Sequence, residues 1–255
     1  MNIDEFMEAL IEYIEKKGMT VLTGAGVSTA SGIRDFNGKN GLYKERIDGR
    51  EILSRNFFEE NPLDFYKFFR KYLINKNVKP NLMHKVIADL QKDGVVNAVI
   101  TQNIDGLDIE AGSKEVFEIH GNASKFQCLS CGCKYSLDDI IEMDIVPKCK
   151  CGGIIRPNII LYGEDPESCL FQIARNKIKY SNSVLVLGTR LEVGTADTLV
   201  RDFIGEKEYF MGQKLDKKLF VVNKGPTVYD YFADYRYAGD IIEVAERIKE
   251  YRKGV

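Results

Sequence analysis

The sequence of 255 residues lacks any long apolar run. Its longest apolar segments, VVNAVIT at 95–101 and SVLVLG at 183–188, are far shorter than the roughly 20 residues that a membrane-spanning helix needs. The N-terminal segment, MNIDEFMEALIEYIEKKG, also lacks the basic start and the unbroken apolar stretch of a secretory signal. We therefore expect a protein that neither enters a membrane nor is exported, and we predict a cytoplasmic location.

An excess of one kind of charge is also missing. The sequence has 36 Lys and Arg residues against 38 Asp and Glu residues, which gives a formal net charge of −2. A chain without a strong overall field is not expected to attract nucleic acid. Its 44% of hydrophobic residues are enough for a core, and it has no internal repeat or low-complexity tract. These features predict one folded unit over residues 1–255, which we expect to act as a monomer.

Histidine is scarce, which leaves few candidates for a general base. Only two are present. His84, within PNLMHKVIADL, lies on a predicted helix and is expected to pack or cap there. His120, within FEIHGN, lies between the end of the predicted strand at 95–101 and the cysteine-rich segment, where open α/β sheets carry their chemistry. Because an imidazole titrates near neutral pH, His120 is the candidate base.

A helix, a strand and a glycine-rich loop open the chain. Apolar residues recur every three or four positions over 3–14, which predicts an amphipathic helix that ends at Gly18. The β-branched run MTVLT at 19–23 predicts a strand that leads into GAGVSTASG at 24–32. This order is typical of α/β proteins.

Three further apolar runs predict the other strands of a sheet. The segments 95–101, 183–188 and 218–223 have the continuous hydrophobicity of strands covered by helices on both faces. The amphipathic stretch 240–251 predicts a closing helix. We therefore predict an α/β fold with a Rossmann-like parallel sheet.

The glycine loop is a candidate for nucleotide binding. Residues 23–28, TGAGVS, lie where a strand ends and a helix begins, so bare backbone could approach a pyrophosphate there. The loop lacks the third glycine of the usual dinucleotide fingerprint, and a tight structural turn would have a similar sequence.

Five of the six cysteines cluster between 128 and 151, which favours a metal site over disulfides. The pairs Cys128/Cys131 and Cys149/Cys151 can supply four thiolates to zinc, and such a closed site is structural. Because the second pair is tightly spaced, Cys133 stays open as a substitute ligand. We expect the sixth cysteine, at 169, to be a small buried hydrophobe.

Aromatic residues are frequent on either side of Pro62. Their helical spacing predicts a packed helical core rather than an aromatic ligand site. The residues are Phe57, Phe58, Phe65, Tyr66, Phe68, Phe69 and Tyr72.

Six motifs occur in order along the chain, with the cysteine pairs between the third and the fourth. They are GAGVSTASGIRDF (24–36), TQNID (101–105), EIHG (118–121), RPNIILYGE (156–164), LGT (187–189) and VVN (221–223). Together they resemble the sirtuin family of NAD-dependent protein deacylases. The resemblance implies a Rossmann part (about 1–38, 84–126 and 154–255), a helical module (about 39–83) and a zinc module (about 127–153).

The resemblance also implies a reaction. The oxygen of an acyl-lysine attacks C1′ of the NAD ribose as nicotinamide leaves, and His120 removes a proton from a ribose hydroxyl. Free lysine, nicotinamide and O-acyl-ADP-ribose result. Asn103 and Asp105 are the other implied catalytic residues. The implied cofactor-binding residues are Gly24, Ala25, Gly26, Thr29, Asp35, Phe36, Asn37, Gln102, Asn103, Ile104, Asp105, His120, Gly188, Thr189, Arg190, Asn223 and Asp240.

By the same resemblance, the acyl-lysine segment of a protein substrate would add as a strand between two backbone edges. The residues that would bind it are Ile160, Tyr162, Gly163, Glu164, Val193 and Gly194. Sirtuins that prefer acidic acyl groups carry a Tyr-x-x-Arg pattern in the helical module. Here Tyr66 is followed at that offset by Phe69, with Arg70 one place later, which predicts acetyl or longer apolar acyl groups.

Three residues depart from the sirtuin pattern at the implied site. They are Asn37 after DF, Asp108 after the TQNID segment, and Arg190 after GT. Arg190 could pair with a cofactor phosphate. Two alternatives to deacylation stay open: an enzyme that hydrolyses NAD or transfers ADP-ribose to protein, and a non-catalytic module that binds NAD or acyl-lysine.

Overall fold

The computed structural model describes residues 1–35, 49–74, 77–166, 168–192, 194–208 and 216–254. Its larger sheet has six strands in the order β3-β2-β1-β7-β8-β9, and every neighbouring pair is parallel. In chain order this is 3-2-1-4-5-6, the strand order of a Rossmann sheet. The strands are β1 (Met19–Thr23), β2 (Val96–Thr101), β3 (Val116–Glu118), β7 (Ser183–Leu187), β8 (Lys218–Val222) and β9 (Tyr235–Tyr237).

The four predicted strands of this sheet are confirmed, each within one residue at its ends. Their continuous hydrophobicity follows from burial on both sides, since all five residues of β1 and of β7 are buried. The short outer strands β3 and β9 were not predicted. Each has only three residues, all partly exposed, so neither carries an apolar run.

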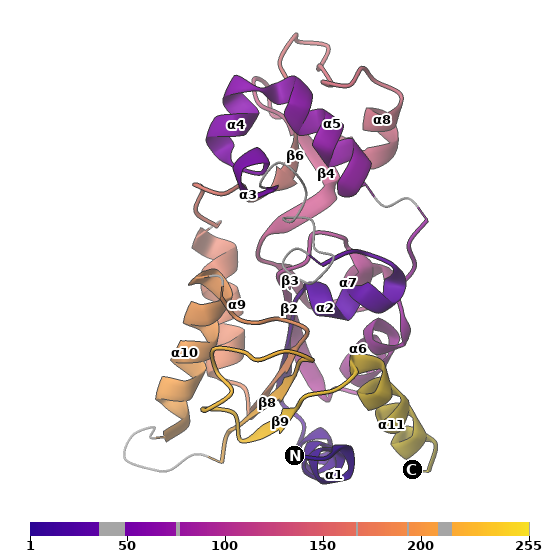
Figure 1. Cartoon of the computed structure of the whole chain (residues 1–255), viewed down its shortest axis with the longest axis vertical. Helices are drawn as coiled ribbons and strands as arrows, with labels where there is room; N and C mark the ends of the chain where they lie inside the picture. Colours follow the sequence, from indigo (N-terminus) through magenta and orange to yellow (C-terminus); the bar gives the residue numbers. More distant parts are fainter. Residues whose placement is uncertain (36–48, 75–76, 167, 193, 209–215, 255) are drawn as a thin grey trace.

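Helices cover both faces of the sheet (Figure 1). One face packs against α1 (Ile3–Lys16), α6 (Leu82–Lys92) and α11 (Ile241–Gly254). The other packs against α9 (Ser168–Lys179) and α10 (Gly194–Glu208). Successive residues of each strand therefore point alternately into the hydrophobic cores on the two faces of the sheet, as expected of a pleated strand.

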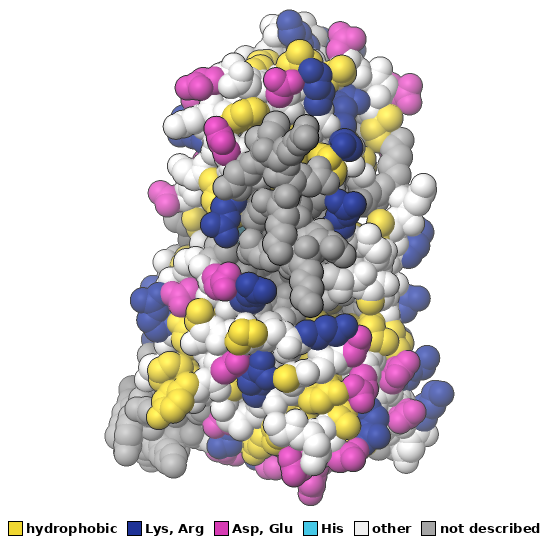
Figure 2. Space-filling view, in the orientation of Figure 1, with side chains coloured by type: hydrophobic (Ala, Val, Ile, Leu, Met, Phe, Trp, Pro, Cys, Tyr) yellow, Lys and Arg dark blue, Asp and Glu magenta, His cyan; other side chains and the backbone are white. Residues whose placement is uncertain are grey.

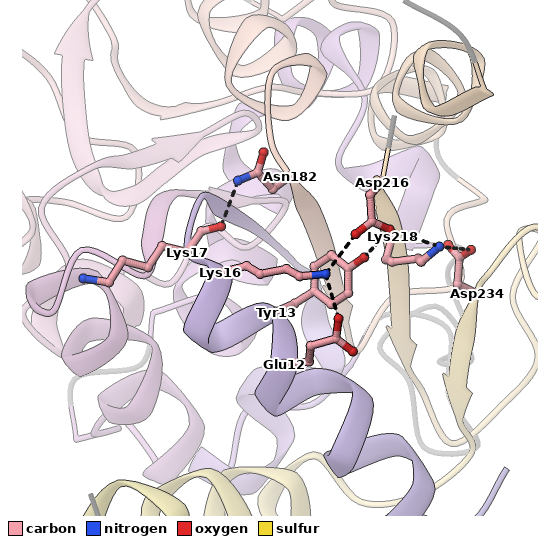
Figure 3. Close-up of polar contacts among 8 residues, drawn as sticks. All are labelled: Glu12, Tyr13, Lys16, Lys17, Asn182, Asp216, Lys218 and Asp234. Atoms are coloured by element: carbon pink, nitrogen blue, oxygen red, sulfur yellow. Dashed lines mark hydrogen bonds and ion pairs between the residues drawn. The ribbon is translucent and has the colours of Figure 1, made fainter. Parts of the chain in front are cut away.

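Polar contacts join helix α1 to the segment that leads into strand β8 (Figure 3). The Tyr13 hydroxyl donates to Asp216 Oδ1 at 2.7 Å, and Lys16 Nζ lies 2.9 Å from Asp216 Oδ2, just before β8. The bonds from Lys16 and Tyr13 lower the pKa of Asp216 to about 2. The helix ends as predicted, because Lys17 and Gly18 both have positive φ.

A smaller part of the molecule lies beyond the carboxyl edge of the large sheet (Figure 1). Its antiparallel sheet has the order β5-β4-β6 and packs against four short helices around a core of its own. The elements are α3 (Gly49–Ile52), α4 (Arg55–Glu60), α5 (Pro62–Tyr72), β4 (Gly121–Cys128), β5 (Lys134–Ser136), α8 (Leu137–Ile141) and β6 (Ile155–Ile159).

The predicted aromatic core lies in this smaller part and is confirmed. Phe65, Tyr66 and Phe69 are fully buried, and their rings contact one another edge-on or stacked. The boundaries expected for the helical and zinc modules stay a prediction, because β4 and β6 run continuously between the smaller part and the cavity described below.

Arg70, at the end of α5, ties the helical segment to the cysteine-rich segment. Its guanidinium donates to backbone carbonyls at and after the end of α8, which would otherwise lack partners. The distances are 2.9 Å to Ile140, 3.2 Å to Met143, 2.7 Å to Asp144 and 3.2 Å to Ile145.

Two predictions about single residues have different outcomes. His84 is fully buried on α6 and its Nδ1 accepts the Asn81 N–H at 3.3 Å, so the packing and capping role is confirmed. Burial lowers the pKa of His84 to about 4. The burial expected for Cys169 is wrong, because this residue lies in the first turn of α9 and is exposed.

The surface mixes charges of both signs. Lys and Arg side chains alternate with Asp and Glu over the face shown in Figure 2, and many form exposed ion pairs that contribute little to stability. Among the described helices, none is both long and apolar enough to cross a membrane.

Replacing Arg70 should destabilise the smaller part. Arg70→Met keeps the aliphatic stem but leaves several carbonyls unpaired, so we expect a loss of about 2–4 kcal/mol in the free energy of unfolding. Lys67→Met on the same helix removes only an exposed ion pair with Asp64 and should change it by less than about 0.5 kcal/mol. Urea unfolding measures both, and equal effects of the two substitutions would contradict this account.

Candidate active site

Two loops meet backbone to backbone at the carboxyl edge of the large sheet. The Gly24 N–H donates to Leu187 O at 3.0 Å, and the Gly26 N–H donates to Gly188 O at 2.8 Å. A Cβ on Gly26 would lie 2.6 Å from Gly188 Cα, so a side chain there would push the loops apart. The glycine loop is thus held by β7 as α2 (Ala25–Ser28) begins.

A cavity of about 1070 Å³ opens above this contact. Residues that follow each of the six strands line it, which is where open α/β sheets bind ligands. Residues after β6 form its opposite wall. The lining includes these predicted site residues: Ala25, Gly26, Thr29, Asp35, Gln102, Asn103, Ile104, His120, Ile160, Tyr162, Gly163, Glu164, Gly188, Thr189, Arg190, Asn223 and Asp240.

The other predicted site residues lie elsewhere. Gly24, Asp105 and Gly194 are next to the cavity but not in its lining. Phe36, Asn37 and Val193 lie outside the described residues. Lining residues that sequence reasoning missed include Leu53, Leu191, Glu192, Thr195, Lys224 and Ile241. Five of these lie next to predicted site residues in sequence but outside the quoted motifs, whereas Leu53 reaches the cavity from the distant helical segment.

His120 lies in the turn between β3 and β4, in the cavity wall. Its Nδ1 is 3.0 Å from Gln102 O and its Nε2 is 2.9 Å from Thr195 Oγ1. Burial lowers the pKa of His120 below its usual value, although the hydrogen bond to Gln102 O acts in the opposite direction. Because a carbonyl only accepts, Nδ1 carries the hydrogen and Nε2 of the neutral ring presents a lone pair.

A buried polar network supports the wall beside His120. The Asn103 amide donates to Gly24 O at 3.1 Å and to Ser28 Oγ at 3.2 Å, and Ser28 in turn donates to Asp105 Oδ2 at 2.7 Å. Asp105 Oδ1 accepts the Leu107 N–H at 2.9 Å. Burial nevertheless raises the pKa of Asp105. Both of its oxygens are engaged, so Asp105 acts on the cavity through Ser28 and Asn103.

Asp108, one of the departures, lies behind this network. It is buried on α7 (Leu107–Glu110), and Thr23 Oγ1 is 3.4 Å from its Oδ2. Its Oδ1 has no hydrogen-bond partner among the described residues. Burial and, secondarily, the negative charge of Asp105 raise the pKa of Asp108 to about 7.

Arg190, another departure, lines the cavity directly. Its side chain is 47% exposed and its Nη1 lies 3.8 Å from Glu192 Oε1. This loose, exposed pair leaves the guanidinium able to move toward an anion in the cavity.

The opposite wall is an extended backbone edge after β6. Tyr162 is joined to the helical segment by two backbone bonds, from its N–H to Leu53 O at 2.9 Å and from the Arg55 N–H to its own carbonyl at 3.0 Å. Glu164 does not carry a free charge, because Arg156 Nη1 lies 2.7 Å from its Oε1. Although burial opposes it, the pairing with Arg156 lowers the pKa of Glu164.

Four cysteines meet in the smaller part in an arrangement that fits zinc. The Sγ atoms of Cys128, Cys131, Cys149 and Cys151 all lie within 4.8 Å of one another, and two of the pairs are 3.5 Å apart. Four sulfurs at about 2.3 Å from a central zinc would be about 3.8 Å apart. Cys133 is exposed and is not a member of this group. Four thiolates close the coordination sphere, so the metal would stabilise the fold and leave no position for substrate.

A model of the Sir2 family matches residues 24–195 of the chain. The chain belongs to the Sir2 family. The sirtuin resemblance of its motifs and its Rossmann-type sheet are confirmed, and its four close cysteines fit the predicted structural zinc site.

Similar sirtuins cover nearly the whole chain. The NAD-dependent protein deacetylase of Clostridium acetobutylicum is 36% identical over 252 residues, which are 96% of this chain and 98% of that protein. The NAD-dependent protein deacetylase of Thermotoga maritima is 37% identical over 255 residues, which are 98% of each chain.

Solved Sir2 structures have the same fold. Sir2 with a p53 peptide and NAD⁺ superposes with a TM-score of 0.86 at 34% identity over 98% of this chain and 99% of that chain. A Sir2 variant with a deacetylated p53 peptide and 3′-O-acetyl-ADP-ribose gives 0.87 at 36% over 98% of each. Sir2 with a propionylated peptide gives 0.85 at 34% over 97% and 98%.

Loss of one metal ligand should unfold the small sheet of this sirtuin. Cys149→Ser removes a zinc thiolate, so we expect the purified protein to lose its zinc and its melting temperature to fall by roughly 10 °C. Cys133→Ser is the matched control and should keep one zinc ion per chain. Elemental analysis and calorimetry measure both. If zinc were retained in Cys149→Ser but lost in Cys133→Ser, Cys133 rather than Cys149 would be the fourth zinc ligand.

Proposed function

We propose that this sirtuin is an NAD-dependent protein deacylase that releases nicotinamide and O-acyl-ADP-ribose from NAD and an acyl-lysine protein. The observation that carries the proposal is the position of His120, a buried imidazole in the wall of a cavity at the carboxyl edge of the sheet. Sirtuins named for this activity are similar over almost their full length.

The cavity suits an extended dinucleotide. The glycine loop with Thr29 and Asp35 would hold the phosphates and the reacting ribose, and Gln102, Asn103 and Ile104 would hold the nicotinamide half. The adenosine half would lie toward Gly188, Thr189, Asn223 and Asp240, and Arg190 could pair with a phosphate. NAD supplies a leaving group that is already cationic, so the chain need only position the reactants, exclude water and supply one base.

His120 is prepared to act as that base. With Nδ1 committed to Gln102 O, the lone pair on Nε2, which faces the Thr195 hydroxyl at 2.9 Å, is the one that can take the proton of a ribose hydroxyl. The lowered pKa keeps the imidazole neutral, and therefore basic, at pH 7. Since the unprotonated form is the active one, activity should be lost only as the pH falls below the usual range of histidine, about 6.5.

The acyl-lysine segment would lie along the backbone edge at Gly163 and Glu164, with Val193 and Gly194 on its other side. Backbone pairing of this kind selects extended segments and little side-chain sequence. Ile160 would offer its carbonyl to the lysine N–H, and its own N–H already donates to His120 O at 2.9 Å, which couples the base to the substrate edge.

The cysteine cluster and the two proposed substrate-binding edges are consistent with a monomer that acts in the cytoplasm. Thiolates gathered for a metal rather than for disulfides are typical of a reducing compartment. An extended peptide segment can be bound by a single chain, since both proposed edges belong to it.

The deciding assay omits each reactant in turn. With NAD and an acetyl-lysine peptide, we expect loss of the acetyl mass matched by nicotinamide release, and His120→Ala should lower kcat/KM by about 10²–10⁴. The acid limb of kcat/KM against pH should lie below about 6.5. Peptide mass and nicotinamide are followed together by mass spectrometry.

The other outcomes of this assay point elsewhere. Nicotinamide release without peptide would favour NAD hydrolysis or ADP-ribosyl transfer. Binding of NAD or acyl-lysine that survives His120→Ala, with no turnover in the unsubstituted protein, would favour a binding module.

The acyl group should be apolar. Tyr66 and Phe69 are buried among other aromatic rings, and Arg70 is committed to the carbonyls after α8, so none of the three offers a cation to a carboxylate on the acyl chain. We expect kcat/KM for a succinyl-lysine peptide to be at least about 100-fold below that of the acetyl peptide of the same sequence. A propionyl peptide is the control for size. Equal kcat/KM values for the succinyl and acetyl peptides would contradict a preference for apolar acyl groups.

A further inference from the structure

The proton-accepting nitrogen of His120 has a partner within the protein itself. Thr195, in the first turn of α10, places its Oγ1 2.9 Å from His120 Nε2. His120 belongs to the turn that leads into the small sheet, whereas α10 covers the large sheet. The contact joins segments 75 residues apart in sequence, and both residues line the cavity.

The chemistry of the contact is fixed by the bond on the other side of the ring. Gln102 O can only accept, so Nδ1 keeps its hydrogen in either charge state of the imidazole. When the ring is neutral, the Thr195 hydroxyl must donate to Nε2. When the ring is protonated, the hydroxyl can turn and accept the Nε2 hydrogen, and a hydrogen bond from a cation is about twice as strong as a neutral one.

We infer that Thr195 is a positioning residue for the proposed base: its hydroxyl holds the His120 ring in place and stabilises the imidazolium that forms when the ring takes a proton. This rests on the proposed function only for its catalytic consequence. No charged side chain is among the causes that shift the pKa of His120, which are burial and the Gln102 carbonyl. The hydroxyl is therefore the group at Nε2 that can offset the cost of burying the cation.

The test replaces the hydroxyl without changing the shape. Thr195→Val removes the acceptor for the Nε2 hydrogen, so we expect the titration midpoint of His120 to fall by about 0.5–1 pH unit. Thr195→Ser should restore it. Thr198→Val is the matched control, because Thr198 lies one turn later on α10 and its hydroxyl bonds to Gly194 O at 2.7 Å.

Nitrogen-15 imidazole NMR reads the midpoint without any need for activity. The chain has two histidines, so the spectrum holds only His120 and His84. Burial places the pKa of His84 at about 4, which makes it an internal reference that should stay unchanged in every variant. A His120 midpoint that is unchanged or raised in Thr195→Val would overturn the inference.

Activity gives a second, separate readout. With NAD and the acetyl-lysine peptide, Thr195→Val should lower kcat by roughly 3–10-fold and move the acid limb of kcat to lower pH, while KM for the peptide changes little. Thr195→Ser and Thr198→Val should resemble the unsubstituted protein. A raised kcat in Thr195→Val would show that the hydroxyl obstructs Nε2 and would refute the positioning role. If the unsubstituted protein shows no turnover, the proposed function fails, whereas the NMR result still decides the role of Thr195.

Discussion

The close approach of two backbones at the carboxyl edge of the large sheet is the constraint on which the site depends. The loop after β1 donates two backbone hydrogen bonds, from Gly24 and Gly26, to carbonyls at the end of β7, and a side chain on Gly26 or Gly188 would collide with the facing backbone. Because the six strands are parallel, all their carboxyl ends reach this edge together. The cavity, its polar wall and its base are consequences of that arrangement.

The second wall of the cavity depends on the smaller part of the molecule. Tyr162 is paired with Leu53 and Arg55 of the helical segment, and Arg70 joins that segment to the carbonyls after α8. The four cysteines lie in the same smaller part, and a zinc ion held by them would stabilise the small sheet. A metal that takes no part in chemistry would therefore support the position of the edge proposed to bind substrate.

Burial has different effects on the pKa values of the ionisable groups near the cavity. It keeps His120 neutral and basic, it raises the pKa values of Asp105 and Asp108, and in Glu164 it is outweighed by Arg156. The carboxylates nearest the base are thus either bonded or shielded. A neutral imidazole in such surroundings needs a local group to stabilise its charged form, and the Thr195 hydroxyl is placed to do so.

The sequence by itself determined the class of sheet, the first and last helices, the cysteine ligands and most of the cavity lining, because continuous apolar runs, glycine pairs and short ordered motifs are local signals. Only the tertiary structure decided that β3 and β9 complete the sheet, that Cys169 is exposed, that Arg70 is bonded to carbonyls, and that Thr195 meets His120. Each of these depends on segments distant along the chain being brought to one place by the packing of the sheet. No local sequence pattern predicts such a contact, because it depends on how distant segments pack together.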